Sequence, residues 1–252
     1  MKRRENMSTG PKPALSELTA DLPNLGGKKS DLIYIALKRA ILFRQLLPDQ
    51  QLLEQDLAGR FGCSQGTIRE ALLRLDDDGL VKRSGYRGTR VTETSLEEAV
   101  EMVRIRLSIE RGVARKIATA DFSQHQDKID GVIRQMAEAH KQDDLYRSSE
   151  LDRAFHCSLA SAADMDLLSP LLLRCALHIH RFTLSSVEVP RRFYQEAGVD
   201  VEHRALLEEL TCGDPDHAEH AISDHLAHVL SRWTPSLYQA VGPSVFNDLR
   251  KR

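Results

Sequence analysis

The stretch FGCSQGTIREALLRL, at residues 61–75, places the strongest limit on how this chain folds. A short turn ends at Ser64, a residue type that often caps the first turn of a helix, and apolar residues then recur at helical spacing over 65–77. Two further segments with helical spacing, 31–46 and 55–61, come before this turn. Two short helices joined by such a turn form a helix-turn-helix unit.

The residues that follow predict a pair of strands. Residues 80–92, LVKRSGYRGTRVT, alternate around a Ser-Gly-Tyr-Arg-Gly turn, as in a β-hairpin. Helix, helix, turn, helix and hairpin in this order predict a winged helix-turn-helix domain over 28–92. Residues 1–27 contain prolines and glycines and show little periodicity, so we expect a flexible N-terminal tail.

After residue 92 the sequence shows helical patterns and no convincing strand. The helical segments are 96–119, 124–141, 144–162, 167–185, 191–210 and 215–230. Turn residues separate them, which predicts a bundle of helices joined by short loops. The expected fold class is therefore mostly α: an N-terminal winged helix-turn-helix, an all-α bundle over 93–235 and a C-terminal tail over 236–252.

Charge is spread unevenly between the two predicted domains. Residues 28–92 hold twelve Lys and Arg against eight Asp and Glu, whereas residues 93–252 hold nineteen against twenty-six. All ten histidines also lie in the second part. This asymmetry indicates a basic module that meets a polyanion, joined to an acidic module with another task.

Other features of the sequence narrow the class of protein. No apolar run is long enough to span a membrane, and no signal-peptide core follows MKRRENMSTG, so we expect a soluble, cytoplasmic protein. The four cysteines form no CxxC pair, which argues against a disulfide framework or a cysteine zinc site.

The third helical segment would enter the major groove of DNA, because the second helix of such a unit does so with its N-terminal residues. Ser64 and Thr67 can donate hydrogen bonds to phosphates or bases, and Arg69 can bind a phosphate or a guanine. Gln65 suits a bidentate contact with adenine. Basic residues of the hairpin, Arg87 among them, would lie on the neighbouring backbone or minor groove. The alternative is a solvated helix followed by a charged hairpin.

Residues 31–91 resemble the winged helix-turn-helix of the GntR family of bacterial transcription regulators. The resemblance rests on LLPDQQLLEQDLAGRFGCSQGTIREALLRLDDDGLV and on the closing GYRGTRV. It implies that the family's DNA contacts fall on Ser64, Gln65, Thr67 and Arg69, with the glycine region of the wing near residues 85–88.

The chain departs from the common form of that family at several positions. The family commonly has Gly in place of Asp49 and Arg in place of Gln65, and FadR-like members often have Arg in place of Gln55. Glutamine at the last two positions removes charge-assisted contacts, so the resemblance implies an operator that differs from the common one.

In the second domain, histidines and an aspartate fall on the inner faces of predicted helices. His225 and His203 lie on the apolar faces of their segments, and Asp152 and His156 are neighbours at i and i+4. Burying these groups is costly unless they are paired, and a divalent cation would resolve the cost. Such N and O ligands suit Zn²⁺, Ni²⁺, Mn²⁺ or Fe²⁺. The alternative is an Asp152–His156 ion pair and two unrelated core histidines.

The motifs LDRAFHCSLA, EHRALLEEL and ISDHL resemble the FCD ligand-binding domain of FadR-like regulators, over about 96–233. The resemblance implies a divalent metal, Zn²⁺ or Ni²⁺ foremost, on Asp152, His156, His203 and His225. Some members of the family that lack these ligands bind acyl-CoA instead, so the complete set argues against that ligand here.

FCD regulators typically sense small carboxylic acids, and the resemblance implies such an effector. Arg106 and Glu110 match the R-x-x-x-E spacing of the family, and Arg106 is the candidate for holding a carboxylate through its planar fork. The alternative is a structural ion pair with Glu110. His178, His180 and Arg181 are further candidates for the cavity wall.

The leading hypothesis is a transcription regulator, a repressor that binds a pseudo-palindromic DNA operator as a homodimer and responds to an effector in the bundle. A metal-dependent enzyme that uses the Asp/His site is the rival from another class, but an enzyme gives no reason for the winged domain. A sensor of the metal itself is a third hypothesis.

Overall fold

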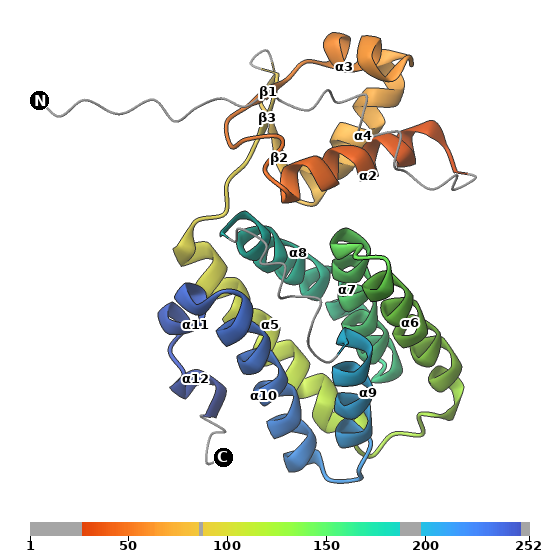
Figure 1. The fold of residues 1–252 in the computed structure, drawn as a ribbon, viewed down its shortest axis with the longest axis vertical. Coiled ribbons are helices and arrows are strands. Elements are labelled where there is room, and N and C mark those ends of the chain that lie inside the picture. Colours follow the sequence, from red (N-terminus) through yellow and green to blue (C-terminus); the bar gives the residue numbers. More distant parts are fainter. Residues whose placement is uncertain (1–26, 86–87, 187–197, 248–252) are drawn as a thin grey trace, which may run out of the picture. The chain divides into compact units, whose positions relative to one another are not determined.

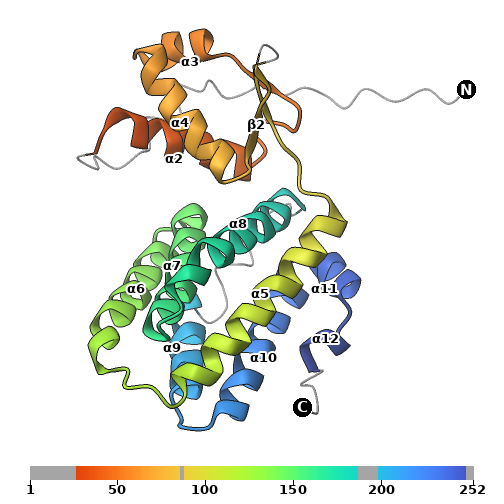
Figure 2. The same ribbon diagram turned by 180° about the vertical axis from the view of Figure 1, so that it is seen from behind.

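The computed structural model describes residues 27–85, 88–186 and 198–247, and the chain divides into two compact units, Met1–Glu93 and Thr94–Arg252. The described residues are mostly helical, with one small sheet in the first unit (Figure 1, and Figure 2 from behind). This confirms the expected fold class. The expected N-terminal tail lies outside the described residues, except for residue 27.

The first unit has the predicted order of helices and strands. Its elements are α2 (Lys29–Leu42), β1 (Gln51–Leu52), α3 (Glu54–Phe61), α4 (Gln65–Asp77), β2 (Val81–Arg83) and β3 (Thr89–Val91). The predicted hairpin is the antiparallel pair of β2 and β3, and β1 adds a third strand on the other side of β3. Helix α2 ends earlier than the pattern predicts, because the backbone leaves the helix at Arg44 with a φ of 55°.

The turn between α3 and α4 is held by its own residues. Gly62 ends α3 with a φ of 58°, a left-handed conformation that glycine adopts without strain. Ser64 caps α4 by accepting a hydrogen bond from the backbone N–H of Thr67 at 3.2 Å. Behind this turn, Ile68 and Leu72 of α4 are fully buried in the core of the unit. The turn therefore fixes how the N-terminal end of α4 is presented.

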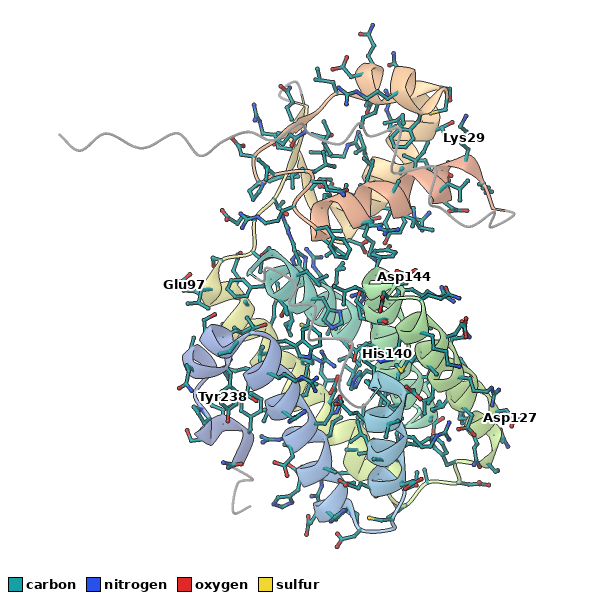
Figure 3. All side chains as sticks on the ribbon, in the orientation of Figure 1. Lys29, Glu97, Asp127, His140, Asp144 and Tyr238 are labelled. Atoms are coloured by element: carbon teal, nitrogen blue, oxygen red, sulfur yellow. The ribbon has the colours of Figure 1, made fainter. Side chains whose placement is uncertain are left out.

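The second unit is helical throughout its described residues. Its elements are α5 (Leu96–Ile117), α6 (Ser123–Lys141), α7 (Leu145–Ala162), the 3-10 turn η2 (Asp166–Leu168), α8 (Ser169–Ser186), α9 (Val199–Leu210), α10 (Pro215–Trp233), α11 (Pro235–Val241) and α12 (Ser244–Asn247). Local caps set several starts: Ser95 and Glu98 form a capping box on α5, and Asp144, labelled in Figure 3, caps α7. Within these residues, no helix is long and apolar enough to cross a membrane.

Two apolar clusters form the core of this unit. One surrounds Phe155 and joins α6, α7 and α9 with the C-terminal half of α5. The other joins the N-terminal half of α5 to α8, α10 and α11. Helices α5 and α10 pack along each other in both views (Figures 1 and 2). The part of the predicted segment 191–210 that precedes residue 198 lies outside the described residues.

The expected C-terminal tail, 236–252, is corrected by the structure over its described part, because α11 and α12 pack into the second cluster. Phe246 is 1% exposed and stacks on the ring of Tyr238, which is labelled in Figure 3. The Arg111 guanidinium donates hydrogen bonds to the carbonyl oxygens of Val245 and Phe246 at 3.0 and 2.8 Å. The apolar pattern of these helices is too short to be distinguished from a tail by periodicity.

Phe246→Ala should therefore destabilise the second unit by about 3 kcal/mol, the lower end of the cost of removing a buried phenyl ring. Asn247→Ala is the matched control, because Asn247 is exposed and next in sequence. Denaturant unfolding of the two variants measures the difference. Equal free energies of unfolding would contradict the packing described for α12.

Candidate functional site

The N-terminal end of α4 presents a polar surface. Ser64 and Gln65 are exposed and Thr67 is half-buried, with the Ser64 and Thr67 hydroxyl oxygens 2.9 Å apart. Gln55, on α3, is exposed too. Arg87 lies outside the described residues. The exposed side chains are thus those that the sequence singles out at the start of this helix.

Arg69 is exposed but already paired. Its guanidinium donates two hydrogen bonds to the Glu54 carboxylate of α3, at 3.2 and 2.7 Å. The Arg69 guanidinium holds the pKa of Glu54 below its usual value. Arg74, further along α4, is tied to Asp31 of α2 at 2.5 Å. The basic side chains of α4 therefore also hold the helices of this unit together.

Asp152, His156, His203 and His225 come together in the second unit, from α7, α9 and α10. One ligand atom from each residue lies within 4.8 Å of all the others. His156 and His203 are 1% and 2% exposed, and Asp152 and His225 are half-buried. Two ligand atoms of a tetrahedral Zn²⁺ site would lie about 3.4 Å apart, given Zn–N distances near 2.0–2.1 Å. The spacing therefore fits one divalent cation after a small inward movement.

The outer nitrogens of two of these imidazoles face oxygens outside the cluster. His203 Nδ1 donates to the Val199 carbonyl at 2.7 Å, and His156 Nδ1 lies 3.2 Å from Glu110 Oε1. Such partners set the tautomer and ring orientation of histidines that bind metals. They leave the Nε2 atoms turned toward Asp152.

The inner atoms of the cluster do not satisfy one another when its imidazoles are neutral. With the hydrogen of His203 on Nδ1, its Nε2 lone pair faces Asp152 Oδ1 at 3.2 Å, so two acceptors oppose each other. His156 Nε2 is buried without a hydrogen-bond partner, and Asp152 Oδ1 is 3.7 Å away. A divalent cation would satisfy these atoms together, so the residues present fit the metal that the sequence predicts.

The ionisation of the cluster follows from its neighbours. Burial alone would raise the pKa of Asp152, but His156, His180 and His203 hold it well below its usual range. Burial would lower the pKa of His156, but the Glu110 and Asp152 carboxylates outweigh it and raise this pKa to about 8. Burial, together with the nearby His203 and His156, places the pKa of His225 well below its usual value. Without a metal, the raised pKa of His156 favours its doubly protonated, charged form.

Arg106 of α5 lies beside the cluster in a buried ion pair. Its Nε is 2.8 Å from Glu110 Oε1, and the two side chains are 5% and 3% exposed. Its Nη2 is 3.9 Å from Asp152 Oδ2, and Arg106 also lines the adjoining cavity. The structural pair and the position at the cavity, which the sequence leaves as alternatives, occur together.

His180 of α8 has a more direct part in the cluster than the sequence indicates. Its Nδ1 accepts a hydrogen bond from Arg153 Nη1 at 2.5 Å, so its hydrogen is on Nε2, which faces Asp152 Oδ2 at 3.2 Å. His178, two residues earlier, points elsewhere and contacts Thr94 Oγ1 at 2.9 Å. Arg181 is buried but does not line the cavity. Residues two positions apart on a helix point in different directions. The spacing of His178 and His180 therefore indicates that only one of them faces the cavity, but it does not show which one.

A cavity of about 110 Å³ adjoins Asp152, Arg106 and His180. Its walls come from α5, α7, α8 and α10. A ligand in this cavity would therefore contact both Asp152 of the cluster and the helices around it.

A winged helix-turn-helix unit, joined to a helical unit that holds a cavity beside an Asp/His cluster, is typical of a DNA-binding regulator. Residues 29–91 match the family described as "Bacterial regulatory proteins, gntR family", and residues 101–228 match the FCD domain. The chain belongs to the GntR family and carries an FCD domain, so it is a DNA-binding transcription regulator and not an enzyme.

Two relatives illustrate the family. The chain is 31% identical over 182 residues to the probable D-xylose utilization operon transcriptional repressor of Paenarthrobacter nicotinovorans, covering 70% of this chain and 76% of that protein. It is 26% identical over 200 residues to the transcriptional repressor RspR of Escherichia coli K12, covering 78% and 85%.

Solved structures of the same fold include McbR/YncC of E. coli, at a TM-score of 0.63 and 19% identity, covering 85% of this chain and 99% of that one. A GntR regulator of Rhodococcus sp. RHA1 matches at a TM-score of 0.62 and 21% identity, covering 82% and 98%. At these identities the likeness concerns the fold alone.

Glu110→Gln should destabilise the metal-free second unit by about 3 kcal/mol, because it leaves the buried Arg106 without its partner. Glu101→Gln is the matched control on the same helix, since the Glu101–Arg104 pair is exposed and worth less than about 1 kcal/mol. Denaturant unfolding in the presence of a chelator measures both. Similar small losses would show that the pair does not hold Arg106 in solution.

Proposed function

We propose that this regulator is a cytoplasmic repressor that binds a pseudo-palindromic operator as a homodimer. We further propose that a small carboxylic acid, bound at a divalent metal in the FCD domain, controls its binding to DNA. The observation that carries this proposal is the convergence of four ligand atoms beside Arg106 at the end of a cavity. Both relatives described above are named as repressors.

Asp152, His156, His203 and His225 would hold the metal. Three imidazole nitrogens and one carboxylate oxygen suit Zn²⁺ or Ni²⁺, and also Mn²⁺ or Fe²⁺. When bound, the cation would supply open coordination positions for a carboxylate oxygen. Arg106 would place its guanidinium beside that carboxylate, because its Nη2 already lies near Asp152 at the cavity.

The charge of the pocket favours an anionic effector. Without metal, the carboxylates of Asp152 and Glu110 are balanced by Arg106 and by a protonated His156. Exchange of that proton for a divalent cation leaves one positive charge in excess. A buried excess charge is costly, so a singly charged carboxylate would restore the balance.

On the DNA side, we propose contacts from Ser64, Gln65, Thr67, Arg69, Gln55 and Arg87. Gln65 would read an adenine through its amide, since this side chain both donates and accepts. Arg69 would exchange Glu54 for a phosphate, and its exposure leaves room for this change. A homodimer would repeat these contacts on two half-sites.

Helix α8 offers a route from effector to DNA. It places His180 in the cavity wall and His178 against Thr94, the first residue of the second unit. A shift of α8 on effector binding would thus act on the segment that directly follows the DNA-binding unit. By reciprocal coupling, DNA would then weaken effector binding as much as the effector weakens DNA binding.

Metal content tests the effector half of this proposal. The dialysed protein should retain one divalent ion per chain, and His225→Gln should weaken binding beyond the roughly 10- to 100-fold that loss of an outer partner costs. His217→Gln on the same helix is the control, because His217 is exposed. A panel of small carboxylic acids should release operator DNA from the wild type and the control only. If the acids release operator DNA equally well in the presence of a chelator and from His225→Gln, a metal-held effector is ruled out.

Selection from a randomised duplex library tests the role of Gln65. Gln65→Arg should replace an adenine by a guanine at one position of each selected half-site, because arginine pairs bidentately with guanine. Gln45→Arg adds the same charge to an exposed site of the same unit. We expect that control to leave the selected bases unchanged. An unaltered consensus with Gln65→Arg would mean that Gln65 does not read a base.

A further inference from the structure

We infer that the effector is a monocarboxylate with a compact apolar body, such as a branched aliphatic or benzoate-sized acid, and neither a sugar acid nor a dicarboxylate. This inference rests on the proposed function, because it names the class of acid that the same cavity would hold. Three properties of the cavity carry it: the chemistry of its walls, the position of its charges and its volume.

The walls are apolar away from the metal end. Asp152, Arg106 and His180 lie at one end of the cavity. The remaining wall is built mainly from Val103, Ile179, Leu226, Val229, Leu230 and Trp233. Such a surface favours an apolar group, because burying it stabilises the complex by about 25 cal/mol per Å².

Three described residues of the wall carry hydroxyl groups, Ser148, Ser149 and Thr183, and those of Ser149 and Thr183 are engaged within the protein. Ser149 Oγ donates to the Tyr146 carbonyl at 2.8 Å, and Thr183 Oγ1 accepts from Thr234 Oγ1 at 2.7 Å. A sugar acid would bring several hydroxyl groups against leucine, valine and tryptophan side chains. Each buried hydroxyl without a partner costs about 1–3 kcal/mol, so the cavity selects against such a ligand.

Among the described residues of the wall, a second carboxylate would meet no opposite charge. Among the described residues that line the cavity, the side chain that is always cationic is Arg106, at the metal end. The far end of a dicarboxylate would lie among apolar side chains such as Leu230 and Trp233. A buried charge without a partner is more costly than a buried hydroxyl, so dicarboxylates are disfavoured more strongly.

The volume limits the size of the body. The cavity encloses about 110 Å³, and an engineered apolar cavity of about 150 Å³ binds benzene. A phenyl ring or a branched chain of a few carbon atoms is therefore near the upper limit. The effector thus combines one carboxylate at the metal end with one small apolar group against α10.

Calorimetric titration of the metal-loaded full chain with acetate, 3-methylbutanoate, benzoate, succinate and D-gluconate tests this inference. We expect benzoate or 3-methylbutanoate to bind at least 100-fold more tightly than succinate and D-gluconate, and more tightly than acetate. Val229→Thr, which adds a hydroxyl at constant shape, should weaken the apolar acids about tenfold. Val201→Thr is its control, because Val201 is 56% exposed and does not line the cavity.

The outcomes separate this inference from the proposal on which it rests. If succinate, D-gluconate or acetate binds as tightly as the apolar acids, the inference is overturned. The proposal of a metal-held carboxylate would still stand. If no acid binds, or binding is the same after metal removal, the proposed effector function fails and the inference with it. Equal binding by Val229→Thr and the wild type would also overturn the apolar contact with α10.

Discussion

The second unit depends on a group of buried charges that four helices must complete together. Arg106 and Glu110 come from α5, Asp152 and His156 from α7, and the other two imidazoles from α9 and α10. Each charge alone would cost several kcal/mol in the interior, so the helices can pack only in the arrangement that brings these groups into contact. Apolar packing around Phe155 supplies stability, but apolar contacts are not directional, whereas these pairs are. The charges therefore fix which faces of the helices meet.

The negative charge of the same group could be balanced either by a proton on His156 or by a divalent metal ion. Glu110 and the Val199 carbonyl hold the outer nitrogens of His156 and His203, so the inner nitrogens face Asp152 whatever occupies the space between them. A proton on His156 balances negative charge on one side of the cluster only. On the other side, burial and the neighbouring imidazoles keep the pKa of His225 well below its usual value. A metal would contact every inner atom at once. The opposed inner atoms destabilise the metal-free cluster, and they are the same atoms that a divalent ion would bind.

Helical spacing placed His203 and His225 on apolar faces and Asp152 and His156 one turn apart, but it left an Asp152–His156 ion pair as the alternative, and the resemblance to the FCD domain implied the complete set of ligands. Spacing gives the face of each helix, but it does not say which helix lies opposite. For that reason the sequence could not choose between His178 and His180, nor show that Glu54 of α3 would hold Arg69 of α4. The winged unit was predictable in more detail because its turn residues are local signals. The last two helices were missed because their burial depends on contacts with α5, far away in sequence.

The cavity and the Asp/His cluster share helices α7 and α10, and this affects which properties of the regulator a substitution could change. Ser148 precedes Asp152 by one turn of α7, and Val229 follows His225 by one turn of α10, so the residues next to ligands along each helix are cavity walls. A substitution at these walls alters what fits in the cavity and leaves the ligand atoms in place. Under the proposed function, metal binding and effector choice would therefore vary separately, although α7 and α10 contribute to both sites. The end of α4 that is proposed to contact bases belongs to a different unit, so operator choice would vary without disturbing either.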